Sequence, residues 1–458
     1  METELNKLVA ALCTSASVLQ GALNDENVPN FRSDDPSPHP WDGGVPPPSA
    51  WYARKALVGL CYQIIALVQD PLERSIIDFT SFSLASSMNA VVRTQPTVAE
   101  VVLASGSDGI AVKDLAKNTG LDETKLYSLM HLLCTWNYFK EIEGGHISAT
   151  RSTRALLPDS FVHGLSDSII AGTAAASMLW EAAKTPSGSQ HPSPFSLYHH
   201  VEIYDWIKAR PDQIERFGRA MDTAEKTLDP GFILDLPVQD LGPNITLVDI
   251  GSGVGGLPMQ LLKRNPGWKA VLQDQEILIP QMESFWKKDA PEIVESGRVT
   301  FLGHSFFEPT PLPPAPKDSP YVFMIKSVLH NWPDDLAAKI LENLLPAAPP
   351  GTVLMIVNYT PAEPEPSKTT VEEFFRRINK HSMAEIQKAK IPLPDLLGVG
   401  WGFGDASVST ADMLMMLLMG SQCRTVTALK ALLETTSWKF EGRTDYRGTT
   451  SVIKARRV

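Results

Sequence analysis

A glycine-rich segment and an aspartate that follows it are suited to holding a nucleotide-like cofactor. The stretch LVDIGSGVGGLP, residues 247–258, begins as an apolar strand and ends in a run of glycines. These glycines match the pattern G-x-G-x-x-G at Gly251, Gly253 and Gly256, which lets a backbone approach a ligand closely. Asp274 follows about 20 residues later, where a carboxylate accepts hydrogen bonds from a ribose. A nicotinamide dinucleotide and an adenosine-bearing sulfonium both contain that ribose, so this spacing leaves both cofactors open.

A third segment, VLHNWPDD at residues 328–335, places a histidine just after a predicted strand. A neutral imidazole is a suitable general base for a phenol or an enol, so His330 is a candidate for proton abstraction. The alternative for His330 is a strand-end residue bonded to the backbone. The same half of the chain lacks a clear arrangement of residues for hydride transfer, which favours the sulfonium cofactor.

Strands and helices alternate from about Pro230 onward and would position these segments. Apolar runs predict strands at residues 247–250, 270–274, 298–307, 321–330 with its exit, and 352–359, with helices between them. This alternation predicts an α/β fold with a doubly wound, mostly parallel sheet. In such a fold the ligand lies at the carboxyl ends of the strands, where the glycines and His330 are expected.

The chain before Pro230 has a helical character. An amphipathic helix is predicted over residues 5–23, followed by a Pro-rich connector to residue 50. Residues 98–150 then predict helix, turn, helix and hairpin, the order of a winged helix. We therefore divide the chain into residues 1–50 as N-terminal helix and connector, 51–229 as a helical and winged-helix domain, and 230–458 as the catalytic domain.

Composition and charge restrict the partners of this chain. A formal net charge of -11 argues against binding to nucleic acid or to an anionic membrane, and the second helix of the winged-helix pattern offers only Lys125 among strong cations. The four cysteines are scattered, without the spacing of metal ligands, so we expect no metal site and a reducing compartment. The acidic N-terminus and the lack of a run of about 18 apolar residues lead us to expect a cytoplasmic protein.

With these motifs, the sequence resembles the class of S-adenosylmethionine-dependent O-methyltransferases that act on plant and fungal phenolics and polyketides. The resemblance rests on VDIGSGVGG, LQDQ, GRVTFLGHSFFEP, VLHNWPDD and PPGTVLMIV, and it extends from the winged-helix region to the C-terminus. It implies a Rossmann-like catalytic domain, an N-terminal domain for homodimerisation, S-adenosylmethionine as cofactor and a small hydrophobic metabolite as substrate.

The resemblance also assigns roles to individual residues. It implies that His330 is the general base, with Lys326 and Asn358 beside it in the catalytic set. The cofactor-binding set that it implies is Asp249, Gly251, Gly253, Gly255, Asp274, Ser305, Phe306 and Lys326. The substrate pocket that it implies contains Trp332, Met415, Met419 and Cys423.

Three positions depart from the pattern of this class. Ser305, Asn358 and Cys423 stand where the class usually has carboxylates. Because a nearby carboxylate stabilises an imidazolium, the loss of the two acids at positions 358 and 423 weakens His330 as a base, although Asn358 can still hold the ring by a hydrogen bond. Ser305 weakens only the contact with the adenine.

Three functions follow from this sequence. The leading one is O-methyl transfer to a hydroxyl or enol of a hydrophobic secondary metabolite of the polyketide or phenolic type, with His330 as the base. The alternative is a methyltransferase-like pericyclase for dehydration, Diels-Alder, hetero-Diels-Alder or Alder-ene steps, in which Lys326 or His330 donates hydrogen bonds. The third is an inactive regulatory or scaffold dimer, against which the retained Gly251, Gly253 and Asp274 argue.

Overall fold

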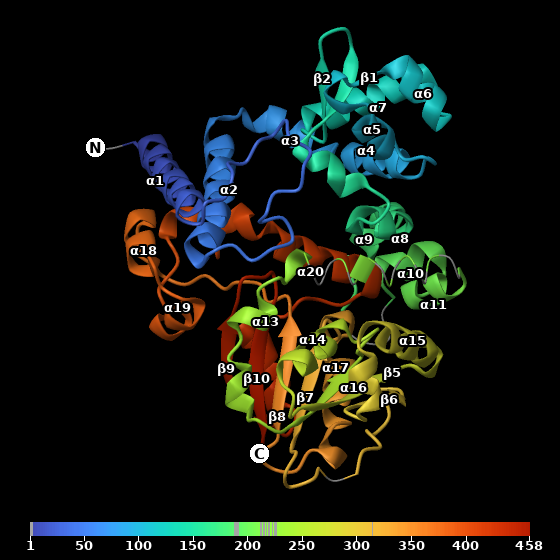
Figure 1. Ribbon diagram of the computed structural model, residues 1–458, viewed down its shortest axis with the longest axis vertical. Coiled ribbons are helices and arrows are strands. Elements are labelled where there is room, and N and C mark those ends of the chain that lie inside the picture. The colour runs from blue at the N-terminus through green and yellow to red at the C-terminus, as the bar shows by residue number, and fades with distance from the viewer. Residues whose placement is uncertain are drawn as a thin grey trace.

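The computed structural model describes residues 3–186, 192–210, 213, 216, 218, 220, 221, 223, 227–313 and 315–458. Part of the helical region predicted at residues 202–226 lies outside these residues. Figure 1 shows two halves, with helices in the first half of the chain and a sheet in the second. Helix α20 (Ala406–Met419), from the C-terminal part of the chain, runs between the two halves.

The second half contains a seven-stranded sheet in the order β6-β5-β4-β7-β8-β10-β9. Its strands are β4 (Thr246–Ile250), β5 (Lys269–Asp274), β6 (Val299–Gly303), β7 (Tyr321–Lys326), β8 (Val353–Asn358), β9 (Trp438–Asp445) and β10 (Ser451–Arg457). The first five pair in parallel, while β10 pairs antiparallel with β8 and β9. The strand order reverses between β4 and β7, and this reversal creates the crevice in which doubly wound folds bind ligands. The predicted α/β class is confirmed.

Helices bury both faces of the sheet, which explains why the parallel strands read as continuous apolar runs. One face packs on α14 (Gly256–Arg264), α15 (Ile279–Asp289) and α16 (Pro291–Glu295). The other packs on α17 (Asp334–Glu342) and α21 (Val426–Glu434). All five residues of β4 are buried, so the glycine turn that follows it starts from a rigid strand.

The helical half begins with a helical pair that packs against a late part of the chain. The helices of this half are α1 (Glu4–Asp25), α2 (Pro48–Val68), α3 (Pro71–Phe79), α4 (Phe82–Val92), α5 (Val98–Ala104), α6 (Val112–Thr119), α7 (Glu123–Thr135), α8 (Phe161–Ala175), α9 (Leu179–Ala183), α10 (Pro194–His199) and α11 (Ile203–Lys208). Leu8 of α1 and Leu60 of α2 share a core with Phe374 of α18 (Val371–Ile378) and with Trp401. The N-terminal helix is therefore covered by C-terminal residues, beside α18 and α19 (Met383–Ala389) in Figure 1.

The winged-helix elements lie in the order that the sequence predicts. Helix α6 ends at Gly120, whose φ is 72°, and the side chain of Asp122 accepts a hydrogen bond from the Lys125 N–H to begin α7. Strands β2 (Phe139–Ile142) and β3 (His146–Ala149) form the hairpin, and β1 (Ile110–Ala111) adds to its edge.

Within the ranges given above, no helix combines the length and the apolar composition that crossing a bilayer requires. In the same part of the chain, no three His, Cys, Asp or Glu residues group as metal ligands would.

Candidate active site

The glycine turn after β4 is held open by its own backbone. The N–H groups of Gly251 and Ser252 donate to the carbonyl oxygen of Gln273 at 2.9 and 3.0 Å, and the Ser252 hydroxyl donates to Asp249 at 2.7 Å. Gly251, Gly253 and Gly255 all have positive φ, the region that favours glycine. The sequence pattern G-x-G-x-x-G pointed to Gly256 as the third glycine, but it is Gly255 that has the left-handed backbone and precedes α14.

The three glycines have different surroundings. A Cβ at Gly251 would lie 2.6 Å from Val328, and a Cβ at Gly255 would lie 2.7 Å from Leu272. At Gly253, no heavy atom of the described residues stands within 4 Å of such a Cβ. The turn is thus packed against the sheet at both ends and open in its middle, which is the place where a ligand can approach the backbone.

Asp274 closes the open side of this turn. One carboxylate oxygen accepts a hydrogen bond from the Gly253 N–H at 2.8 Å, and the other accepts from the Gln275 N–H at 2.7 Å. Burial raises the pKa of Asp274, and these two backbone N–H groups oppose that rise. The ends of β4 and β5 therefore bring the glycine turn close to Asp274, the residue predicted to bind the ribose.

Aromatic side chains line the next part of the crevice. Phe306 and Phe307, which follow β6, lie edge-on to Trp332 with ring centroids 5.9 and 4.8 Å away. Tyr204 of α11 stacks on the same indole at 6.4 Å. Ser305 caps the Phe306 turn, because its hydroxyl accepts a hydrogen bond from the Phe307 N–H. Trp332 thus packs beside Phe306, a predicted cofactor residue, and Tyr204 adds a wall that the sequence did not indicate.

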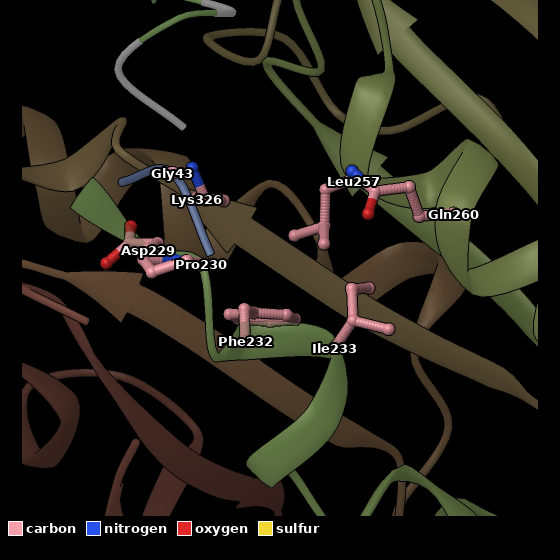
Figure 2. A pocket seen from close by; sticks show the side chains of 8 residues that line it. All are labelled: Gly43, Asp229, Pro230, Phe232, Ile233, Leu257, Gln260 and Lys326. Carbon is pink, nitrogen blue, oxygen red and sulfur yellow. The ribbon is translucent and has the colours of Figure 1, made fainter. Parts of the chain in front are cut away.

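Lys326 ends β7 and lines a cavity of about 170 Å³. Figure 2 shows it beside Gly43 and Asp229, with Leu257 and Gln260 of α14 across the cavity. Asp229 accepts hydrogen bonds from the N–H groups of Thr449 and Thr450, both at 3.0 Å, so its carboxylate is already engaged. The cavity therefore combines an ammonium and an amide with an apolar wall, and its cover includes part of the N-terminal connector.

His330 lies in the short turn after β7 and is buried. Burial, together with the positive charges of Lys326 and Arg424, lowers its pKa to about 3. Among the described residues, its Nδ1 atom has no hydrogen-bond partner. The imidazole is thus uncharged at neutral pH.

The end of β8 lies next to this histidine. Ser327 after β7 donates its N–H to the Val357 carbonyl oxygen at 2.9 Å, and the ring of Tyr359 lies 5.8 Å from that of His330. Asn358 is buried, and its Oδ1 atom has no hydrogen-bond partner within the described part of the chain. Burial raises the pKa of Tyr359 to about 12, which keeps its hydroxyl protonated.

The substrate-pocket residues predicted on and after α20 divide into two groups. Cys423 is buried, its N–H donates to Asp412 at 2.7 Å, and burial together with Asp412 raises the pKa of its thiol to about 12. Met415 is half-buried on α20. Met419 instead packs with the cluster of α8 and α10 around Phe195.

Sequence analysis missed Arg424, which is the best-anchored side chain near His330. Its guanidinium donates to the carbonyl oxygens of Leu329 and Trp332 at 2.6 and 2.7 Å, and to Asp334 at 2.7 Å. Its place directly after Cys423 was the available signal. Tyr359 and Tyr204 were missed as well, because only the fold brings them to the crevice.

The charges of this site favour oxygen anions. An imidazole flanked by two cations is a poor base, but Lys326, which lines the cavity, can stabilise a phenolate or enolate oxygen and so make such a group more acidic. The site can therefore assist an acidic enol, or it can donate hydrogen bonds to a carbonyl.

Comparison with known proteins relates this chain to one family by sequence. Residues 181–385 match the model of the O-methyltransferase domain. An O-methyltransferase of the fungus Armillaria gallica is 25% identical over 83% of this chain and 82% of its own length.

Comparison with solved structures relates the fold to two kinds of enzyme. The O-methyltransferase NcsB1 of neocarzinostatin biosynthesis, solved with S-adenosylmethionine and 2-hydroxy-5-methyl naphthoic acid, matches with a TM-score of 0.61 at 16% identity, over 83% of this chain and 98% of that one. A pericyclic reaction enzyme matches with a TM-score of 0.66 at 14% identity, over 97% of this chain and 98% of that one.

Proposed function

We propose that this chain, which matches the O-methyltransferase domain over residues 181–385, is an S-adenosylmethionine-dependent enzyme that methylates a hydroxyl or enol of a small hydrophobic metabolite. The observation that carries the proposal is the open middle of the glycine turn at Gly253, bordered by the carboxylate of Asp274. The match to the O-methyltransferase domain supports the cofactor, and the apolar and aromatic side chains around Trp332 support a hydrophobic substrate.

The residues present fit this cofactor. Gly253 leaves room along the turn, and Asp274 offers carboxylate oxygens for a ribose. Phe306 and Trp332 provide apolar surface for the adenine, while Gln260 of α14 and Lys326 at the end of β7 offer polar groups to the cavity. When bound, S-adenosylmethionine supplies an electrophilic methyl group on a sulfonium. Ser305 in place of a carboxylate leaves one adenine contact weaker than in the class.

The chain's own residues prepare the attacking oxygen. His330 is uncharged and can accept a proton at nitrogen, but its low pKa means that it removes a proton only from an acidic group. Lys326, which lines the cavity, stabilises the oxyanion that results. We therefore propose an enol or an acidic phenol as the substrate class, and we assign to Asn358 the holding of the substrate or of the His330 ring.

The experiment compares metabolites from a producing host with the gene intact and deleted, fed with methyl-labelled methionine. A gene-dependent product that is heavier than its precursor by one CH2 and carries the label supports methyl transfer. Complementation with His330→Ala and with Asp274→Ala tests the site, since both should lose the labelled product. Lys269→Ala at the opposite end of β5 is the matched control and should restore it.

A second function is favoured by the electrostatics of His330. The suppressed basicity of the imidazole suits a pericyclase, because such a reaction needs shape and hydrogen-bond donors and no strong base. The fold likeness to a pericyclic reaction enzyme over 97% of this chain is in line with it. In the same experiment, this function gives a product that is isomeric with its precursor, or lighter by water, and without label. A chain that alters no metabolite would be the inactive scaffold.

We also propose a homodimer built on the helical half. Helix α3 exposes Leu72, Ile76 and Phe79, which are 76, 66 and 87% accessible and lie on one face. Isolated chains rarely expose such a contiguous apolar surface, so a second copy of the chain is the expected cover.

A further inference from the structure

Arg424 is almost completely buried, and its contacts concentrate on one short segment. Its side chain is 1% exposed, and all three of its described partners lie between residues 329 and 334. Two of these partners are backbone carbonyl oxygens, one on each side of His330 in the sequence. A planar guanidinium presents its N–H groups in a fixed fork, so it holds both carbonyls in one geometry.

The residue before Arg424 is hydrogen-bonded to α20, the helix on which part of the substrate pocket is predicted. The N–H of Cys423 donates to Asp412 of α20 at 2.7 Å. Residues 423 and 424 therefore connect α20 to the turn that carries His330, across 94 residues of sequence.

Among the described residues, three groups with a charge or a titratable proton face His330 from the elements packed around it. Lys326 comes from β7, Arg424 from the segment after α20, and Tyr359 from the end of β8. The first two are cations, and Tyr359 stays neutral. An imidazole in this setting gains nothing from taking up a proton.

We infer that Arg424 is a positioning residue of the active site, which fixes the turn that carries His330 and, together with Lys326, keeps the imidazole uncharged. This role rests on the proposed function only in that His330 faces the reacting oxygen. It gives the site a neutral hydrogen-bonding group in a defined place, in contrast to the carboxylate-supported base of the class.

Two variants separate the geometric role from the electrostatic one. Arg424→Gln removes both the charge and most of the fork, so the imidazole should protonate about one pH unit higher, and turnover should fall on the order of 10- to 100-fold. Arg424→Lys keeps the charge, so the imidazole should titrate nearly as in the parent, while turnover still falls because one ammonium cannot hold both carbonyls. Binding of S-adenosylhomocysteine, measured by calorimetry, should stay within a few-fold in both variants.

The control is Arg457→Gln. Arg457 also donates to two backbone carbonyls, those of Leu345 and Ala348, but at the other end of the strands, near the start of β8. This variant should lower thermal stability without moving the titration of His330. The titration is followed by NMR of histidine-labelled protein without cofactor or substrate, with His330→Gln used to assign the signal.

The inference is overturned if Arg424→Gln titrates like the parent and loses no more turnover than Arg457→Gln does. If Arg424→Gln does not fold, Arg424→Lys decides, and unchanged turnover in that variant rejects the positioning role. A failure of the proposed function looks different, because the titration shift would persist while the labelled product or the binding of S-adenosylhomocysteine is missing.

Discussion

Gly253 and Gly255 lie two residues apart in the same turn, yet they should respond differently to the same substitution. Gly253→Ala meets open space, so the folded protein should lose only about 1 kcal/mol from the left-handed backbone, while binding of S-adenosylhomocysteine should fall at least about 10-fold. Gly255→Ala drives a methyl into Leu272 and Trp286 and should destabilise the whole domain. Calorimetric binding and thermal melts of both variants check this. Normal binding by a folded Gly253→Ala protein would place the cofactor elsewhere.

The suppressed basicity of His330 has a consequence for stability. Its pKa is about 3 in the folded chain and 6.5 ordinarily, so between these values the unfolded chain binds a proton that the folded chain does not. The contribution of His330 to the free energy of unfolding is therefore present above about pH 6.5 and is lost as the pH falls toward 3. Between pH 7 and pH 5 this loss is about 2 kcal/mol.

His330→Gln should therefore lose less stability on acidification than the parent does. Urea unfolding at pH 7 and pH 5 measures the difference, and exposed His381→Gln serves as the control that should behave like the parent. Equal losses in His330→Gln and in the parent would show that the imidazole titrates normally.

At the scale of elements, the sequence predicts what local pattern and burial determine. The strands β4 to β8 were predicted because parallel strands covered on both faces are continuous apolar runs. The antiparallel strands β9 and β10 and the helix α18 were not assigned. The sequence of β9, WKFEGRTD, has only two apolar side chains among charged residues and a glycine, and α18 has only 8 residues, so neither presents a long periodic signal.

The same limit applies to the site. The turn at Gly251 and the carboxylate of Asp274 were predictable because spacing along one βαβ unit places them together. Arg424 was not predictable, because its role depends on a return of the chain over 94 residues to the turn of His330. Motifs therefore predict the candidate cofactor side, while the long-range packing around His330 needed the structure.

The exposed face of α3 predicts how the chain assembles. Ile76→Lys places a charge in the middle of the apolar face and should convert a dimer into a monomer, because burying an unpaired ammonium is costly. Glu73→Gln, on the same helix, should leave the dimer intact. Light scattering coupled to size-exclusion chromatography measures the mass. A dimeric Ile76→Lys protein would move the interface away from α3.

At the scale of the whole molecule, the connector between α1 and α2 joins the two halves. The side chain of Arg151, after the winged-helix hairpin, pairs with Asp42, and its backbone N–H donates to the carbonyl oxygen of Ser33 at 3.0 Å. Arg447, in the turn between β9 and β10, donates to the carbonyl oxygen of Pro46 at 2.6 Å. Between these anchors lies Gly43, which lines the Lys326 cavity, so the connector forms part of the cover of the site.

Arg447 is the anchor whose loss should affect the whole fold. Its guanidinium also pairs with Asp235, which is 2% exposed, so Arg447→Met leaves a buried carboxylate without its cation and should cost about 3–5 kcal/mol. Arg32→Met removes an exposed ion pair to Asp34 in the same connector and should leave the unfolding midpoint unchanged. Urea unfolding followed by tryptophan fluorescence compares the two. Equal midpoints would mean that Asp235 is compensated elsewhere, and that the connector covers the cavity without depending on Arg447.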